Sequence, residues 1–115
     1  MNYRVERSRD TDHDLAAIFD FLIQSYREFG EDADSAIDLA ATRLRSIEKT
    51  MLSLGRAPHQ GTLRPELLPG LRCVTKQRLI FYFDVDDERK VLRVLAIFFG
   101  GQDHHRQMLK RLLGR

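Results

Sequence analysis

The stretch that decides the fold runs from Leu79 to Phe99 and reads LIFYFDVDDERKVLRVLAIFF. Two apolar runs, Leu79–Val85 and Val91–Phe99, are separated only by the polar segment DDERK at 86–90. Aromatic and β-branched residues on both sides of a short polar turn are typical of a β-hairpin. This stretch therefore predicts two long strands paired in an antiparallel sheet.

Further strands are expected on both sides of this hairpin. Tyr3–Arg7 alternates apolar and charged residues, as a short half-buried strand does. Residues 56–70 contain all three prolines together with Gly61 and Gly70, so that this segment is expected to be a loop. The chain after the loop predicts three antiparallel strands in meander order, at about 71–76, 78–85 and 91–99.

Two amphipathic helices are expected between the first strand and the loop, because apolar residues recur there at spacings of three and four. Gly30 and Gly55 are expected to end them, and the short connection between them predicts an antiparallel helical hairpin. Asp103 is positioned to cap a short final helix. The two apolar faces consist of Leu15, Ile18, Leu22, Tyr26 and Phe29, and of Ile37, Ala40, Leu44, Ile47, Met51 and Leu54.

The predicted fold is α+β in the order β-α-α-β-β-β-α, as a single domain over residues 1–115. A length of 115 residues, 43% of them hydrophobic, is sufficient for one modest core. The longest purely apolar run, Val94–Phe99, is too short to span a membrane. The N-terminal residues have no signal-peptide pattern, and the one cysteine, Cys73, fits a reducing cytoplasm as a small buried thiol. We therefore expect a cytoplasmic protein that does not bind membranes.

Charge is distributed unevenly along the chain. Residues 1–54 hold 7 basic and 11 acidic residues, a net charge of −4, whereas residues 55–115 hold 12 and 6, a net charge of +6. This asymmetry favours an anionic partner for the second half. If Arg72 and Arg78 lie on adjacent antiparallel strands, their guanidinium groups converge on one face, with Lys76 nearby and Tyr82 able to stack a base. The alternative is that these cations only solvate the end of the sheet.

Metal and cofactor sites are not expected. His104, His105 and Asp103 are adjacent in sequence and point in different directions on a helix, and no Cys or His partner is near them. The glycines at 100 and 101 are not followed by the Lys-Ser/Thr of a phosphate-binding loop. The prediction is a protein without metal or cofactor.

Several short motifs, taken in order, resemble the ParE/RelE superfamily of toxins from type II toxin–antitoxin modules. The opening strand leads into an acidic helix start at Arg9-Asp10, and a long second helix follows. The loop LPGLR at 68–72 and the strand RLIFY at 78–82, with its Arg-x-x-x-Tyr pattern, are similar to those of the family. The last strand, VLRVLAI at 91–97, is also similar.

The resemblance implies a small bacterial toxin that is neutralised by a cognate antitoxin, encoded beside it, in a hetero-oligomer. RelE-like members cleave mRNA on the ribosome without a metal, whereas ParE-like members inhibit DNA gyrase and have a role in plasmid stabilisation. ParE-like members often read His-Gly-Arg-Gln-Asp after the last strand, where this chain has FGGQD at 99–103. The glycine, Gln102 and Asp103 match, and no tyrosine follows Tyr82. The retained glycine, Gln102 and Asp103 favour the ParE-like branch, and the lack of a later tyrosine disfavours a nuclease.

The candidate site residues follow from these two branches. For a gyrase-directed toxin we expect the target or another anion to be bound by Arg72, Lys76, Arg78, Tyr82, Arg93 and Arg106. In a metal-free endoribonuclease, His104 or His105 would be the base, and Arg72 or Arg78 would hold the phosphate. A third possibility is a degenerate toxin that serves only as the antitoxin's partner in a repressor complex.

Overall fold

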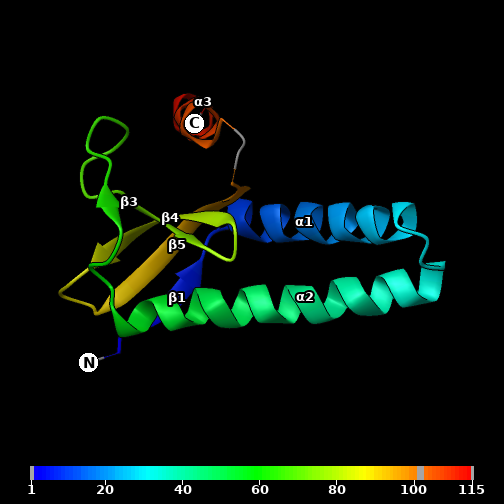
Figure 1. Ribbon diagram of the computed structural model, residues 1–115. Coiled ribbons are helices and arrows are strands. Elements are labelled where there is room, and N and C mark those ends of the chain that lie inside the picture. The colour runs from blue at the N-terminus through cyan, green and yellow to red at the C-terminus, as the bar shows by residue number, and fades with distance from the viewer. Residues whose placement is uncertain (1, 101–102, 115) are drawn as a thin grey trace.

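The structure is a computed structural model that describes residues 2–100 and 103–114 (Figure 1). In this part of the chain one five-stranded sheet, ordered β1-β5-β4-β3-β2, is packed with three α-helices. β1 runs parallel to β5, and the other neighbouring strands are antiparallel. The predicted α+β class and meander are confirmed, and the predicted elements occur in the predicted order with one additional strand, β2 (Thr62–Leu63). The elements are β1 (Arg4–Arg7), α1 (Arg9–Glu28), α2 (Ala33–Ser53), the 3₁₀ helix η1 (Leu54–Arg56), β2 (Thr62–Leu63), β3 (Arg72–Lys76), β4 (Leu79–Asp86), β5 (Val91–Phe99) and α3 (His104–Leu113).

Strands β4 and β5 form the centre of the sheet and place alternate residues on its two faces. Phe81 and Phe83 face α1 and α2, where they pack with Leu15, Ile18, Ile47 and Met51. Tyr82 and Ile80 face the other side, toward α3. A register shift between Tyr82 and Phe83 makes Leu95 the extra residue of a β-bulge on β5. The hairpin predicted from the sequence is thus the central layer between two cores.

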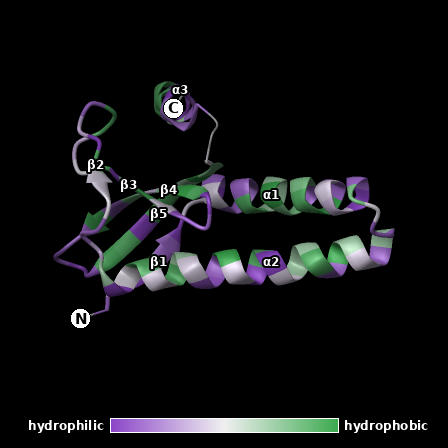
Figure 2. Ribbon diagram, in the orientation of Figure 1, coloured by the Kyte–Doolittle hydropathy of each residue, from purple (hydrophilic) through white to green (hydrophobic). Residues whose placement is uncertain are grey.

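Helices α1 and α2 lie side by side and antiparallel, and both extend past the end of the sheet (Figure 1). Both alternate hydrophilic and hydrophobic residues along their length, as amphipathic helices do (Figure 2). The apolar faces predicted from the sequence are not buried along the distal half of the hairpin. Phe29 is 89% exposed and Ile37 is 44% exposed, because no strand lies beneath that half.

The ends of the two helices differ slightly from the prediction. Ser8 caps α1, since the Ser8 side chain accepts a hydrogen bond from the Thr11 N–H. Gly30 follows α1 with a φ of 104°, as expected of a glycine that ends a helix. α2 ends at Ser53 and continues as the 3₁₀ turn η1, so that Gly55 lies inside a helical turn. The chain therefore leaves the hairpin in a tighter turn than the sequence indicated.

The segment predicted as a loop, 56–70, contains the additional edge strand β2. Thr62 pairs with Cys73 and Leu63 pairs with Arg72. Gly61 makes this pairing possible, because its φ is +81° and a Cβ there would lie 2.4 Å from the carbonyl oxygen of Cys73. Two residues are too few to give an alternating pattern, so β2 could not be recognised from the sequence.

Helix α3 packs on the face of the sheet opposite to the hairpin (Figure 1). Asp103 caps it as predicted, since its carboxylate accepts from the Arg106 N–H. Met108 is the one α3 residue that is fully buried among those described. Within the described residues, the chain has no helix with the length and apolar character needed to cross a membrane.

Candidate functional site

The face of the sheet beneath α3 holds a small second core. Its buried members come from β3, β4, β5 and α3, and Leu67, Leu95 and Leu112 pack against them. They are Leu71, Cys73, Ile80, Tyr82, Ala96, Phe98 and Met108. The prediction that Cys73 is a buried thiol is confirmed. The Cys73 sulfur accepts a hydrogen bond from Arg64 Nε at 3.4 Å.

Polar contacts hold both ends of α3 to the body. At its first turn, His104 Nδ1 lies 2.8 Å from Tyr82 Oη, and His105 Nε2 lies 3.3 Å from a carboxylate oxygen of Glu66. At its last turn, Arg111 donates to both carboxylate oxygens of Asp14, each at 2.9 Å, and its guanidinium carbon lies 5.0 Å from the centre of the Phe98 ring. A bidentate arginine–carboxylate pair is a strong and directional contact.

Tyr82 is fully buried beneath this helix. Burial raises the pKa of the Tyr82 hydroxyl to about 12, because an ionised phenolate would lose its water. The expectation that Tyr82 stacks a base is wrong for this conformation, since α3 and the sheet cover the ring. The fold brings Tyr82 and His104 together, but their side chains form a hydrogen bond with each other.

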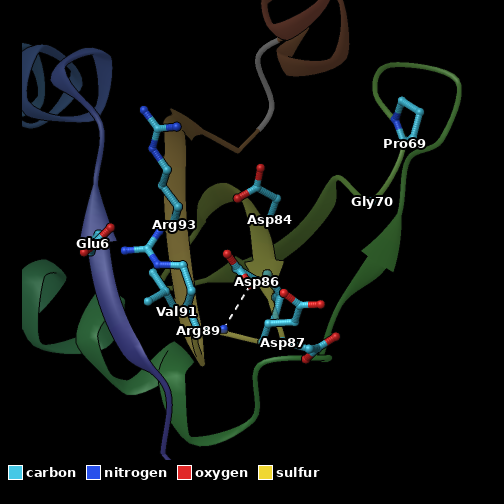
Figure 3. A pocket seen from close by; sticks show the side chains of 11 residues that line it. Glu6, Pro69, Gly70, Asp84, Asp86, Asp87, Arg89, Val91 and Arg93 are labelled. Carbon is cyan, nitrogen blue, oxygen red and sulfur yellow. Dashed lines mark hydrogen bonds between the residues drawn. The ribbon is translucent and has the colours of Figure 1, made fainter.

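Beside α3, the same face opens into a groove of about 520 Å³ (Figure 3). Strand β4 continues from Tyr82 to Asp84 and Asp86, which point to the same side of the sheet. Burial raises the pKa of Asp84, although nearby Arg93 opposes the shift. Five carboxylates and two arginines contribute to the lining, from Glu6, Asp84, Asp86, Asp87, Glu88, Arg89 and Arg93. The open part of this face is therefore acidic, whereas the sequence indicated a basic end.

The predicted convergence of Arg72 and Arg78 is also wrong. Arg72 lies opposite Phe83, and its Nη1 donates to the carbonyl oxygen of His59 at 2.7 Å. Arg78 lies in the turn between β3 and β4, at the other end of β3. The four residue-to-residue steps from Arg72 to Lys76 separate these ends by roughly 13 Å. Arg72 therefore ties the sheet to the loop after η1 and does not share a site with Arg78.

The other predicted cations are also dispersed. Lys76 is exposed at the end of β3, next to the turn that carries Arg78. Arg93 is exposed opposite Asp84, beside the acidic groove. Arg106 is exposed on α3, 3.3 Å from Asp103. Of the six predicted target-binding residues, only Lys76 and Arg78 are close neighbours in the chain and in the fold.

Sequence reasoning missed the contacts that join distant segments. Asp14 and Arg111 are 97 positions apart, and Glu66 and His105 are 39 apart. At the turn between β4 and β5, Asp87 accepts from Tyr3 Oη and contacts His59 Nε2, each at 2.8 Å. The Tyr3 hydrogen bond, followed by the contact with His59, lowers the pKa of Asp87. No local pattern reveals such pairs, because their geometry exists only after folding.

Among the residues that the structure describes, no group of three or more His, Cys, Asp or Glu is placed to hold a metal ion. General acid–base cleavage of RNA needs two proton-exchanging groups around an accessible phosphate. Here His104, in the first turn of α3, contacts Tyr82, and five carboxylates and two arginines line the neighbouring groove.

Solved structures with a similar arrangement come from toxin–antitoxin systems. A chain of the chromosomal ParDE system from P. aeruginosa is 22% identical, with a TM-score of 0.65, over 85% of this chain and 96% of that one. The RelBE2 toxin–antitoxin complex of Mycobacterium tuberculosis contains a chain that is 16% identical, with a TM-score of 0.61, over 89% of this chain and 95% of that one. The chain therefore shares its fold with chains of these toxin–antitoxin structures.

The isolated E. coli RelE toxin has a similar fold, at 12% identity and a TM-score of 0.52, over 96% of this chain and 98% of that one. No family model and no curated protein sequence matches the chain. The similarity to these structures is therefore one of architecture.

Proposed function

We propose that this chain is the toxin of a type II toxin–antitoxin module, that it acts in the cytoplasm by binding DNA gyrase as ParE-like toxins do, and that a cognate antitoxin neutralises it. The ParE/RelE fold and the similarity to a chain of a ParDE system support the toxin assignment. The observation that supports binding over catalysis is the pairing of His104 with Tyr82 beneath α3, next to a groove lined by five carboxylates.

Electrostatics supports the same conclusion. A ribonuclease of this size needs cations that converge on the scissile phosphate while a base removes the 2′-hydroxyl proton. Arg72 instead donates to the carbonyl of His59, and Arg93 faces Asp84 at the groove. A poison that acts by binding a protein needs none of this machinery.

A ribosome-dependent endoribonuclease of the RelE type is the second candidate. One observation favours it, namely that a histidine and a tyrosine lie 2.8 Å apart at one end of α3. In that case an α3 displaced on the ribosome would free both groups for proton transfer. This candidate therefore predicts that activity depends on His104.

The histidines provide the test. We expect that inducible expression of the chain arrests growth, that the purified protein inhibits supercoiling by gyrase, and that ribosome-bound mRNA stays intact. The double variant His104→Ala, His105→Ala should remain toxic, since a binding poison loses at most a contact or two, about 1–2 kcal/mol. A nuclease would lose roughly 10²- to 10⁴-fold in rate with its base.

The matched control is the double variant His13→Ala, His59→Ala, which removes the other two histidines from exposed positions. Co-expression of the protein encoded by the adjacent gene should restore growth in every toxic case. Codon-dependent mRNA cleavage that disappears only in the His104, His105 variant would replace the gyrase assignment with the nuclease. Binding of the neighbouring gene product without any toxicity would instead identify a degenerate toxin.

A further inference from the structure

The turn between β3 and β4 has an unusual backbone. Gln77 and Arg78 both have a positive φ, of 53° and 65°, and neither is glycine. Two-residue hairpin turns with two such residues strongly favour Asn-Gly, because a side chain in the left-handed region is strained. Strain of this kind persists only where the surrounding structure imposes it, and it is frequent at functional sites.

Contacts from α2 and from the end of β5 hold this turn in place. The carbonyl oxygen of Gln77 accepts from Arg43 Nη2 at 3.2 Å, and the Gln77 side-chain amide donates to Thr50 Oγ1. From β5, the Gly100 N–H donates to the carbonyl oxygen of Arg78 at 2.7 Å. A Cβ at position 100 would lie 2.9 Å from that oxygen, so that only glycine fits without adjustment. The backbone is fixed, and the Arg78 side chain is left exposed.

An apolar surface lies directly beside this turn. Phe99 is opposite Leu79 in the sheet, and its ring packs against Phe21 of α1 with 4.8 Å between ring centres. Phe21 is nevertheless 53% exposed. A cavity of about 140 Å³ opens next to the rings, and the described residues that line it include two arginines and no carboxylate: Ile18, Leu22, Arg43, Ile47, Gln77, Arg78, Leu79 and Phe99.

We propose that this turn surface, defined by Phe21, Arg43, Lys76, Arg78 and Phe99, docks an acidic segment of the toxin's protein target. One apolar side chain of that segment enters the cavity, and carboxylates beside it pair with Arg78 and Lys76. Aromatic rings and arginines in a compact patch are the composition of binding hot spots. The site is small and built on a helix, a strand and a fixed turn. An antitoxin that folds on binding covers extended surfaces instead.

This inference rests on the proposed function, and gyrase holoenzyme is the probe. Phe21→Ala and Arg78→Glu should each raise the concentration that half-inhibits supercoiling at least about tenfold. Phe29→Ala, directly after the same helix, and Arg89→Glu in the β4–β5 turn are matched controls, since both residues are exposed. The controls should stay within about twofold of the parent. Growth arrest of cells that express each variant is the second readout.

A third substitution at the turn separates binding from folding. Arg78→Gly removes the guanidinium and relieves the left-handed strain, so that the thermal midpoint should stay the same or rise while inhibition falls as far as in Arg78→Glu. A misfolded protein cannot give this combination. If Arg78→Gly lowers both the thermal midpoint and the inhibition of gyrase, the result would contradict the proposed role of the turn.

Each remaining outcome decides one point. If the Phe21 and Arg78 variants match their controls in both readouts, the turn surface is not a docking site. If they lose binding to the antitoxin and still inhibit gyrase, the occupant is the antitoxin and the proposal is overturned. If the parent chain arrests growth without inhibiting gyrase, the gyrase assignment fails, and the growth assay of the same variants still decides the surface. A chain that neither arrests growth nor inhibits gyrase overturns both.

Discussion

The two faces of the sheet differ in how completely they are covered. The face toward the hairpin is covered by two helices of 20 and 21 residues, and its core combines aromatic residues of β4 with aliphatic residues of α1 and α2. Within the described residues, the one helix on the opposite face is α3, of 10 residues, and Leu67 of the preceding loop also packs there. The part of that face beyond α3 is the acidic groove.

Helix α3 is seen end-on in Figure 1, whereas β4 and β5 extend in the plane of the view, so α3 lies across the strands and not along them. It covers Tyr82 and Phe98, and the strand residues beyond it, which include Asp84 and Arg93, line the groove. One face maintains the fold, and the other combines a small core with a solvent-exposed groove.

The largest effect is expected on the hairpin face. Phe83 is fully buried there, so that Phe83→Ala should lower the free energy of unfolding by about 3–5 kcal/mol through lost burial and a cavity. Urea denaturation monitored by circular dichroism measures this loss. Phe29→Ala, at the exposed tip of the hairpin, should change stability by less than about 0.5 kcal/mol. Equal losses in the two variants would mean that the hairpin face is not the dominant core.

A smaller and more local effect is expected under α3. Met108→Ala removes the helix's buried anchor at a cost of about 2 kcal/mol or more. Because the helix covers Cys73, its undocking should be detected as faster reaction of this single thiol with a disulfide reagent, by roughly 30-fold. Leu109→Ala, one position further on the same helix, is the control and should react at nearly the parent rate. Unchanged labelling in the Met108 variant would show that α3 does not protect Cys73.

The smallest effect concerns the acidic groove. Burial raises the pKa of Asp84 above its usual value of 3.8, so that the folded state disfavours its charged form. The stabilisation from Asp84 is therefore fully present below pH 3.8 and is lost as pH rises through the folded pKa. Asp84→Asn should be more stable than the parent at pH 7, by well under about 1 kcal/mol because the site is partly solvated.

Urea denaturation of the parent chain and of Asp84→Asn, each at pH 3 and at pH 7, checks this expectation. At pH 3 the carboxyl group is neutral, and the two stabilities should be closer than at pH 7. A variant less stable than the parent at pH 7 would mean that the pairing of Asp84 with Arg93 outweighs burial. The acidic groove would then stabilise the fold instead of opposing it.

Local sequence features were sufficient for most of the architecture. The period-two pattern of β4 and β5, the spacing of apolar residues in α1 and α2, and the Asp103 cap each depend on residues within one or two turns of one another. Hydrophobic periodicity determines which face a residue occupies, and so the hairpin and the meander were predictable. The family resemblance followed from the same local segments.

The candidate site depended on the tertiary structure. Arg78 was predicted as the first residue of a strand that faces Arg72, but it lies in a left-handed turn at the far end of β3. Contacts of Arg43 and Thr50 with the preceding residue, Gln77, hold that turn in place. Tyr82 was predicted to bind a ligand, but α3 buries it.

The sequence by itself determined the elements, their order and the two apolar faces, because these follow from neighbouring residues. Only the tertiary structure decided that the cations disperse, that the open groove is acidic and that Asp14 holds Arg111. Those outcomes depend on side chains up to 97 positions apart, whose distances are set only when both cores have packed.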